Sequence, residues 1–384
     1  MAEMAALVED THYMRLALSV AELGRSQTTP NPLVGAVLVK DGEVVGQGAH
    51  LKPGGPHAEI HALRMAGEKA EGATAYVTLE PCSHYGRTPP CADALIKAGV
   101  KRVVVAMEDP DPRVQGQGVA KLRSAGMDVT TGVLALEAGK LNEAYLKLKE
   151  TGRPFVTWKC AATLDGRIAT QNGHSSYVTG PESRRTVHEL RRRIPVIAVG
   201  IQTVLADDPR LTVRLDGEVE SNRQPLRVVF DSKLRMPTAA AMLREPGKTL
   251  IYTTEEAVRK EQEKYTLLQQ HEVEITALPA DEYGRVSLEA ALKHLGQLGY
   301  DELLLEGGAT LAGAFLKRQW IDKVVYYIAP KFLGGGLPAL TGLELSTMSE
   351  AVLLQDVTWS QVGTDFRLEG YPMYPQESVE SKGD

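Results

Sequence analysis

His57, Glu59, Cys82 and Cys91 are the residues whose types and spacing are best suited to chemistry. An imidazole nitrogen and two thiolates are typical ligands of zinc, and three protein ligands leave a fourth position open for water. Zinc makes such a water acidic enough to attack an amino-bearing ring carbon near neutral pH. Because Glu59 lies two residues from His57, its carboxylate can carry the proton of the water to the leaving amine. The pattern predicts a hydrolytic deamination.

The spacing of the two cysteines departs from the usual signature of zinc nucleobase deaminases, in which Pro-Cys-x-x-Cys follows His-x-Glu. Here the eight residues 83–90 separate Cys82 from Cys91. A pair of prolines directly before Cys91 favours an extended entry into a helix. We expect the intervening loop to overhang the metal, where His84 and Arg87 can touch a substrate.

A structural zinc site is the main alternative, since free cysteines are often buried apolar residues and a lone histidine is usually structural. A structural site is closed by a fourth protein ligand, and His84 is the only obvious candidate in the sequence. A structural metal has no use for a proton-carrying carboxylate next to its histidine. The presence of Glu59 therefore favours catalysis.

Alternating strands and helices are predicted to position these residues. His57 begins an apolar-periodic helix, Cys82 follows a strand, and Cys91 begins a second helix. Ligands of layered α/β domains collect at strand ends, which is where both metal-binding segments lie. The expected helices are 13–23, 57–65, 91–98, 119–124 and 136–148, and the expected strands are 33–39, 44–50, 75–79, 102–107 and 128–133.

The length of 384 residues exceeds one ordinary hydrophobic core, so two domains are expected. The segment Thr151-Gly152-Arg153-Pro154 interrupts the first pattern. We expect one domain over 1–150, a second over 151–375 and a loose polar tail over 376–384. The second domain should contain strands at 155–162, 195–200, 226–231, 249–253, 272–277 and 302–305, and helices at 181–192, 255–270 and 288–298 and one that ends at Arg318.

Glu306-Gly307-Gly308-Ala309-Thr310 joins the last of these strands to a helix. Paired glycines before a helix can cradle phosphates, because the backbone approaches the ligand closely and the helix N-terminus offers free N–H groups. The G-x-G-x-x-G fingerprint is absent, which argues against a standard Rossmann site. A tight turn without a ligand is the alternative.

Composition narrows the class of protein. With Cys82 and Cys91 assigned to a metal, Cys160 is left as a packed small residue, so no disulfide framework is expected and a cytoplasmic location is favoured. The sequence has neither a signal peptide nor an apolar run of about 18 residues, so no membrane association is expected. The net charge of −6 argues against nucleic acid. An arginine-rich run at 184–193 fits either a solvated helix face or a phosphate site.

Three segments resemble the bifunctional riboflavin biosynthesis deaminase-reductase family: 31–37 (NPLVGAV), His57-Ala58-Glu59 and 78–91 (TLEPCSHYGRTPPC). The long loop between Cys82 and Cys91 is what separates that family from cytidine and tRNA deaminases. The resemblance covers about residues 10–375. In the second half it is carried, in family order, by Lys159, 164–167 (LDGR), 205–209 (LADDP), 211–214 (LTVR), 306–308 (EGG) and 329–331 (APK).

The resemblance implies an α/β fold, with an N-terminal cytidine-deaminase-like three-layer α/β/α domain and a C-terminal dihydrofolate-reductase-like α/β domain. It implies one Zn²⁺ per chain and NADPH as cofactors. The first implied reaction deaminates a diaminopyrimidinone that carries a phosphoribosylamino group, and the second reduces its ribosyl carbon to a ribityl chain. The resemblance also implies a cytoplasmic homo-oligomer that acts on this small pyrimidine ribotide.

The functional residues of the family carry over to matching positions of this chain. His57, Cys82 and Cys91 would bind zinc, with Glu59 as the acid and base. Arg191 and Arg214 supply planar donors that a substrate phosphate favours. The implied substrate positions are Asn31, His50, Arg87, Lys159, Ser175, Arg191, Leu211, Arg214 and Glu306. The implied cofactor positions are Ala161, Tyr177, Thr203, Asp207, Ser232, Gly307, Gly308, Ala309 and Thr310.

Tyr177 stands where the family commonly has tryptophan, and a smaller aromatic ring can still stack on a cofactor. Lys159 fits a strand that faces an anionic ligand, although a surface lysine paired with a glutamate is the alternative. Asp207 is a candidate for positioning or protonating the sugar oxygen.

Three rival functions stay open at this point. A single-function nucleoside or tRNA deaminase would use the C-terminal half only for binding, although the acidic balance speaks against RNA. A zinc-stabilised scaffold would have no use for Glu59. A folate-type or pterin-type reductase would oxidise its cofactor without the ribosylated intermediate.

Overall fold

The computed structural model describes residues 2–85, 89–111, 114–215, 218–219, 224–271 and 273–374. The chain forms two compact units, residues 1–153 and 154–384. Each unit has its own main sheet and its own hydrophobic clusters. The residues expected to form a polar tail lie outside the described part.

The first unit is built on a five-stranded sheet with the order β2-β1-β3-β4-β5. The antiparallel hairpin β1–β2 lies at one edge, and β3, β4 and β5 run parallel to one another. The strands are β1 (Gly35–Lys40), β2 (Glu43–Ala49), β3 (Thr74–Val77), β4 (Arg102–Val105) and β5 (Asp128–Thr131). The helices are α1 (Ala2–Ala21), α2 (Ala58–Ala66), α3 (Cys91–Lys97), α4 (Gln117–Ser124), α5 (Ala135–Leu141) and α6 (Glu143–Thr151).

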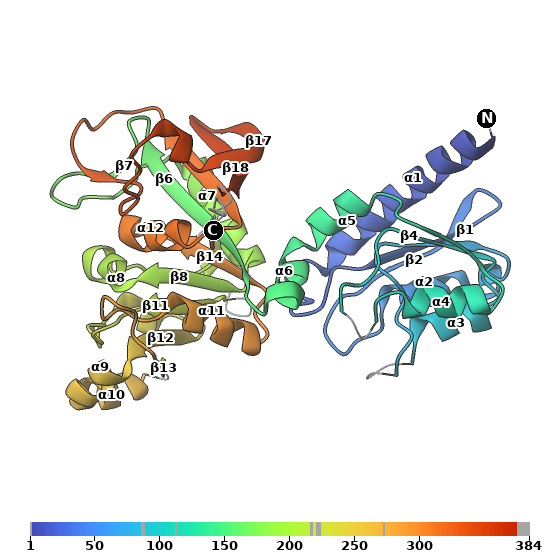
Figure 1. The fold of residues 1–384 in the computed structure, drawn as a ribbon, viewed down its shortest axis with the longest axis horizontal. Coiled ribbons are helices and arrows are strands. Elements are labelled where there is room, and N and C mark those ends of the chain that lie inside the picture. The colour runs from blue at the N-terminus through green and yellow to red at the C-terminus, as the bar shows by residue number, and fades with distance from the viewer. Residues whose placement is uncertain are drawn as a thin grey trace, which may run out of the picture. The chain divides into compact units, whose positions relative to one another are not determined.

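Helices cover both faces of this sheet, as Figure 1 shows. Small residues of α2, together with α3 and α4, pack on one face around Leu38 and Val103. Met14 and Ala17 of α1 pack on the other face with Ala138 of α5. This three-layer α/β/α arrangement is the one predicted for the first domain.

The second unit is built on a nine-stranded sheet with the order β13-β12-β11-β8-β14-β6-β15-β18-β17. The strands from β13 to β15 are parallel, whereas β18 and β17 complete the sheet as an antiparallel hairpin. The strands are β6 (Phe155–Thr163), β8 (Val196–Gly200), β11 (Leu226–Phe230), β12 (Thr249–Thr254), β13 (Val273–Leu278), β14 (Glu302–Glu306), β15 (Lys323–Ala329), β17 (Leu353–Val362) and β18 (Asp365–Met373).

Helices also cover both faces of the central part of this larger sheet (Figure 1). Helices α11 and α12 pack on one face, and helices α7, α8, α9 and α10 pack on the other. Their bounds are α7 (Pro181–Arg193), α8 (Ile201–Asp207), α9 (Glu255–Lys260), α10 (Gln262–Gln269), α11 (Leu288–Gln297) and α12 (Ala309–Lys317). Short pairs at the periphery are β7 (Arg167–Ala169) with β16 (Leu337–Pro338) and β9 (Arg214–Leu215) with β10 (Glu218–Val219). The α/β class expected for the second domain is confirmed.

Two helices predicted as continuous are each divided in two. The expected helix 136–148 breaks at Asn142, because the buried amide of Asn142 bonds to both the N–H and the carbonyl of Leu33, at 2.8 and 3.0 Å. The expected helix 255–270 breaks at Glu261, whose φ of −111° lies outside the helical range. In the first case a tertiary contact overrides a helical pattern that the sequence suggests.

The strands β15, β17 and β18 were not predicted from the sequence. The run Lys323–Ala329 is rich in valine, tyrosine and isoleucine, which is the signal that could have identified β15. Among the described helices, none combines the length and the apolar content that a membrane crossing requires.

Candidate active sites

The three predicted metal ligands come together in the first unit. His57 directly precedes α2, Cys82 follows β3 and Cys91 opens α3. The Nδ1 atom of His57 lies 3.2 Å from Sγ of Cys91 and 3.6 Å from Sγ of Cys82. The three ligand atoms all lie within 4.8 Å of one another. In the described part of the chain, His84 does not belong to this cluster, so the fourth ligand of a structural site is missing from it.

Glu59 lies in the first turn of α2 and is only 3% exposed. Its Oε2 atom has no hydrogen-bond partner among the described residues. Burial, together with the negative charge of Cys82, raises the pKa of Glu59 to about 7. The hydrogen bond between the two thiols, followed by the one from His57, lowers the pKa of Cys82 to about 4. A carboxyl group whose pKa is raised toward neutrality thus lies beside a thiol whose pKa is lowered.

Asn31 and His50 lie next to this cluster. The His50 ring lies 5.4 Å from the His57 ring, nearly perpendicular to it. Nδ1 of His50 is 3.2 Å from the carbonyl of Pro56, and Nε2 is 3.0 Å from the amide nitrogen of Asn31. Burial lowers the pKa of His50. A neutral imidazole that donates to Pro56 and accepts from Asn31 satisfies both contacts and fixes the side chain of Asn31.

Glu80 is a positioning residue within the segment 78–91, and the sequence predicted no role for it. Its buried carboxylate accepts backbone N–H bonds from Gly116 at 2.9 Å and from Gly118 at 2.8 Å, with further bonds from Asp109 and Val119. These bonds attach the start of α4 to the segment that carries Cys82. A glutamate two residues before a predicted ligand, at the end of a buried strand, was the available signal.

Gly48 of β2 lets α2 approach the sheet closely. A Cβ atom at this position would lie 2.4 Å from Cβ of His61 and 2.5 Å from the carbonyl oxygen of Ala58. Because α2 carries Glu59 and begins directly after His57, the missing side chain of Gly48 helps to set the position of the metal cluster. Arg87, the remaining substrate residue predicted for this unit, lies outside the described residues.

A second group of charged residues forms in the second unit. Lys159 of β6 and Glu306 of β14 are paired neighbours on adjacent parallel strands. Arg191 of α7 binds both carboxylate oxygens of Glu306, at 2.7 and 2.8 Å. Burial alone would raise the pKa of Glu306, but Arg191 outweighs it and lowers this pKa to about 2. Arg191 is therefore committed to Glu306, and Lys159 lies beside this pair.

Arg214 and His188 complete this charged group. The backbone N–H of Arg214 donates to Nδ1 of His188 at 3.2 Å. Burial, followed by the charges of Arg191 and Arg214, lowers the pKa of His188 to about 4. The Nε atom of Arg214 and the hydroxyl of buried Thr212 have no hydrogen-bond partner among the described residues. These polar atoms leave donors free for an anionic ligand.

Ser175 lies against Asp207 at the exposed end of α8, and Tyr177 follows Ser175 two residues later in the chain. The hydroxyl of Ser175 donates to Asp207 at 2.8 Å. Tyr177 is 72% exposed, has a positive φ of 60° and lies under the guanidinium of Arg184, 4.7 Å from its ring centre. Leu211, by contrast, is buried and also has a positive φ. Ala161 lies two residues after Lys159 on β6 and packs against the α7 side of the sheet.

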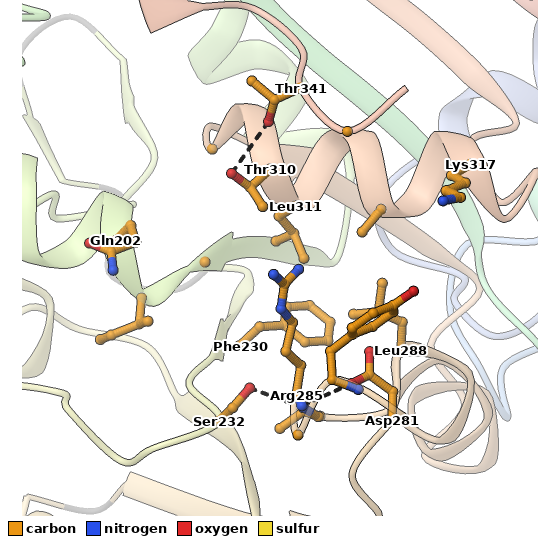
Figure 2. A pocket seen from close by; sticks show the side chains of 18 of the residues that line it. Gln202, Phe230, Ser232, Asp281, Arg285, Leu288, Thr310, Leu311, Lys317 and Thr341 are labelled. Atoms are coloured by element: carbon orange, nitrogen blue, oxygen red, sulfur yellow. Dashed lines mark hydrogen bonds between the residues drawn. The ribbon is translucent and has the colours of Figure 1, made fainter. Parts of the chain in front are cut away.

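A pocket of about 790 Å³ opens beside α12, at the carboxyl ends of β8 and β11. Figure 2 shows Thr310 and Leu311 of α12 facing Gln202, Phe230 and Ser232 across it. Of the predicted cofactor positions, Thr203, Ser232, Gly308 and Thr310 line the pocket. The other five, Ala161, Tyr177, Asp207, Gly307 and Ala309, are not among its lining residues.

The turn before α12 has a backbone conformation that favours glycine at both Gly307 and Gly308. Gly307 and Gly308 both have positive φ values, 74° and 71°. A Cβ atom at Gly307 would lie 3.1 Å from the hydroxyl of Thr203. The turn therefore brings the start of α12 against Thr203 and leaves backbone N–H groups at the edge of the pocket.

Both units match known protein families. Residues 154–368 match the family model described as the RibD C-terminal domain, and residues 7–107 match the cytidine and deoxycytidylate deaminase zinc-binding region. The riboflavin biosynthesis protein RibD of Escherichia coli (strain K12) is 47% identical over 349 residues, which cover 88% of this chain and 93% of that protein. This chain belongs to the RibD family.

Other RibD proteins agree along nearly the whole chain. RibD of Aquifex aeolicus (strain VF5) is 44% identical, covering 93% of this chain and 96% of that protein. The structure of Acinetobacter baumannii RibD is similar with a TM-score of 0.85 at 40% identity, covering 96% of this chain and 99% of that one. A Thermotoga maritima structure is similar with a TM-score of 0.84 at 36% identity, covering 96% and 100%, and its title names a diaminohydroxyphosphoribosylaminopyrimidine deaminase/5-amino-6-(5-phosphoribosylamino)uracil reductase.

Membership of the RibD family confirms the predicted fold of both units and the predicted class of enzyme. The chain is a bifunctional enzyme of riboflavin biosynthesis, with a deaminase domain followed by a reductase domain. The single-function deaminase considered above is not favoured, because the C-terminal half matches the RibD reductase domain rather than a binding module.

Proposed function

We propose that the first unit deaminates 2,5-diamino-6-(5-phosphoribosylamino)pyrimidin-4(3H)-one and that the second unit then reduces the ribosyl chain of the product with NADPH. Deamination is assigned to residues 1–150 and reduction to residues 151–375. The observation that carries the proposal is the cluster of His57, Cys82 and Cys91. The buried carboxylate of Glu59 lies beside it, in the first turn of the helix that follows His57. Both substrate names in the Thermotoga maritima title support it.

The donor set of the first unit fits one zinc ion. With ligand bonds of the usual length, a tetrahedral zinc site places a nitrogen and a sulfur ligand about 3.6 Å apart. The two distances from His57 Nδ1 to the thiols, 3.2 and 3.6 Å, agree with this spacing. When bound, zinc supplies the Lewis acid that makes water nucleophilic at neutral pH. His57, Cys82 and Cys91 would hold it.

Glu59 would carry the proton between water and the leaving amine. A carboxylate with a pKa near 7 exchanges a proton readily at neutral pH, and the Oε2 atom of Glu59 is free of protein partners among the described residues. Asn31, fixed by His50, would position the pyrimidine ring, and Arg87 is proposed to contact the same substrate.

In the second unit, Lys159 and Arg214 would contact the phosphoribosyl substrate. Arg214 has the free Nε donor, so it is the better candidate for the phosphate, and Arg191 would hold Glu306 and the 212–214 segment in place. Ser175 and Leu211 belong to the same proposed substrate group. Asp207, bonded to Ser175, would position or protonate the sugar oxygen.

The pocket beside α12 fits a dinucleotide in volume and in its position at the strand ends. Gly307, Gly308, Ala309 and Thr310 would hold the pyrophosphate at the start of α12. Thr203 and Ser232 line the pocket, whereas Ala161 and Tyr177 are proposed to flank the end of the cofactor nearest Lys159. When bound, NADPH would supply the reducing equivalents for the sugar carbon.

We also propose that the chain forms a homo-oligomer through the edge strand β17. Eight of its ten residues are exposed, and only one, Asp356, is charged. Edge strands of monomers are usually protected by lysine, proline or a covering segment. Trp359 is 61% exposed and lies on the same face of the hairpin as Phe366 and Leu368. An edge with a single charge and an exposed tryptophan suits antiparallel pairing with a second copy.

An assay that follows ammonia and NADPH together tests the two proposed reactions. Purified protein is mixed with the diaminopyrimidinone ribotide and NADPH, and ammonia release is recorded beside absorbance of the reduced nicotinamide. We expect both signals, each sensitive to a chelator, because reduction depends on the deaminated product. Ammonia release without loss of NADPH would leave deamination standing and contradict the proposed reduction.

A further inference from the structure

The strap, residues 174–180 between β7 and α7, carries Ser175 and Tyr177, which are proposed to bind ligands of the reductase. The strap forms neither helix nor strand, so contacts with neighbouring segments must hold it in place. The hydroxyl of Ser175 donates to Asp207 at 2.8 Å. The ammonium group of Lys331 donates to the carbonyl of Tyr177 at 3.2 Å. Both bonds are exposed to water, which competes with them.

The end of the strap at α7 is held by a buried carboxylate from a distant part of the chain. Oδ2 of Asp365 accepts the backbone N–H of Gly180 at 2.7 Å and the hydroxyl of Ser183 at 2.6 Å. Asp365 is 2% exposed, and Ser183 is fully buried. Hydrogen bonds to a carboxylate are about twice as strong as neutral ones, and burial strengthens them further. This contact therefore fixes the end of the strap better than the exposed bonds fix its middle.

The bonds of Asp365 replace a cap that α7 lacks. The N-cap residue of α7 is Gly180, which has no side chain to accept the free N–H groups of the first turn. In a capping box, a side chain at the third helical position accepts the N–H of the N-cap residue. Ser183 occupies the third position of α7, and its hydroxyl donates to Asp365, whose carboxylate supplies the missing bond. The negative charge of Asp365 also lies at the positive end of the α7 dipole.

The hairpin of β17 and β18 brings Asp365 to this place. Val362 pairs with Asp365, so Gly363 and Thr364 form the turn between the two strands. Gly363 has a positive φ of 61°, and a Cβ atom there would lie 2.6 Å from Oε2 of Glu182 in the first turn of α7. The turn therefore packs directly on the start of α7, which lies beside β18 in Figure 1.

We propose that Asp365 is a positioning residue of the reductase, which holds the strap and the first turn of α7 where Ser175 and Tyr177 can contact the substrate and NADPH. This inference rests on the proposed reductase function and on the place of the strap in it. Helix α7 also carries His188 and Arg191 of the charged group described above. Both side-chain hydrogen bonds described for Asp365 go to the start of α7, so Asp365 acts through this helix and the strap.

Steady-state reduction of the deaminated ribotide by the full-length protein tests the proposal. We expect D365A to raise the KM for this substrate by about tenfold, and D365N, which keeps an acceptor without the charge, to raise it less. S183A removes one of the two bonds and should also raise the KM, so the test remains possible if D365A does not fold. The kcat should change by less than about threefold, because the strap contributes mainly to binding.

Two controls belong to the same measurement. Ammonia release by the first unit should not change in any of these variants. D356N removes an exposed carboxylate from β17 of the same hairpin and should leave the KM of the reductase unchanged.

Two further measurements separate positioning from a general loss of stability. Hydrogen exchange followed by mass spectrometry should show faster exchange of the strap amides in D365A and D365N, with unchanged exchange in β11. The double variant D365N/S175A should raise the KM by less than the product of the two single effects, because both substitutions act through the strap.

The outcomes separate this inference from the function on which it rests. If the wild-type protein oxidises NADPH while D365A and S183A change neither the KM nor the exchange of the strap, the positioning role is wrong and the proposed reductase stands. Independent effects in D365N/S175A, or faster exchange throughout the second unit, would also overturn the positioning role. A wild-type protein that does not oxidise NADPH with the deaminated ribotide would remove the proposed reductase and this inference together.

Discussion

Glu59 is the side chain on which deamination should depend most, because it is the only carboxylate of the α2 turn next to the metal cluster. We expect E59Q to lower the rate of ammonia release by about 10² to 10⁴-fold, the usual contribution of an acid-base group. Metal content, measured by atomic absorption, should be unchanged, because Glu59 is not a predicted ligand. NADPH oxidation with the deaminated intermediate should also be unchanged. A variant that deaminates at nearly the wild-type rate would remove Glu59 from the mechanism.

Arg214 should act in reduction alone. We expect R214A to raise the KM of the reductase for its substrate by about tenfold or more, because a charge-assisted phosphate contact is lost. Ammonia release should not change. R210A is the matched control, since Arg210 is half-exposed and already pairs with Glu245. An unchanged KM in R214A would contradict the phosphate role.

The ion pair of Glu306 with Arg191 should make the stability of the second unit depend on pH. The pKa of Glu306 is lowered from 4.5 to about 2, so the ionised carboxylate stabilises the fold fully above about pH 4.5, and this contribution is lost as the pH falls toward 2. Its size is on the order of 3 kcal/mol.

Urea unfolding followed by tryptophan emission measures this effect, because Trp158, Trp320 and Trp359 all belong to the second unit. The difference in unfolding free energy between the wild type and E306Q should shrink from pH 6 to pH 3. A difference that stays constant over this range would show that ionisation of Glu306 contributes nothing.

At the scale of elements, the close approach of α2 to β2 determines where the metal ligands lie. We expect G48A to destabilise the first unit by about 1 to 3 kcal/mol, because the added methyl group meets the backbone of α2. The zinc affinity should fall with it, since His57 directly precedes α2. G139A is the control, because its Cβ would lie 4.0 Å from the side chain of Leu146 and meet nothing closer. A neutral or slightly stabilising effect is therefore expected. Thermal melting and zinc titration of both variants provide the comparison.

Local pattern was enough to predict most elements of both units, and tertiary contacts explain where it was insufficient. The helix that begins after His57 and the helix that begins at Cys91 follow from apolar periodicity and from the prolines before Cys91. The break at Asn142 depends on a contact with Leu33, which no local pattern contains.

The candidate sites show the same limit. Residue type and spacing were sufficient to predict the cluster of three ligands, because few residue types bind zinc. The backbone partners of Glu80 and the pairing of Arg191 with Glu306 could not be predicted, because each depends on a partner that is distant in sequence. Charge alone suggested that both Arg191 and Arg214 contact the phosphate, but Arg191 is paired with Glu306.

At the scale of the whole molecule, the exposed strand β17 should control assembly. We expect W359E to convert an oligomer into a smaller species in light scattering, because the new charge would be buried against a second copy. L267E places the same charge on exposed α10 and should leave the mass unchanged. A wild-type protein that is already monomeric at micromolar concentration would contradict the proposed assembly.

The position of β6 has a consequence for synthesis on the ribosome. It is the first strand of the second unit in the sequence, yet it lies between β14 and β15, which begin at Glu302 and Lys323. After Thr163, the last residue of β6, the ribosome must therefore translate about 140 further codons before either neighbour of β6 exists. Until then this apolar strand has no partner within its sheet, while the first unit already has its whole sequence and can fold. Nascent chains that stall within this interval would leave β6 unpaired and open to association with other chains.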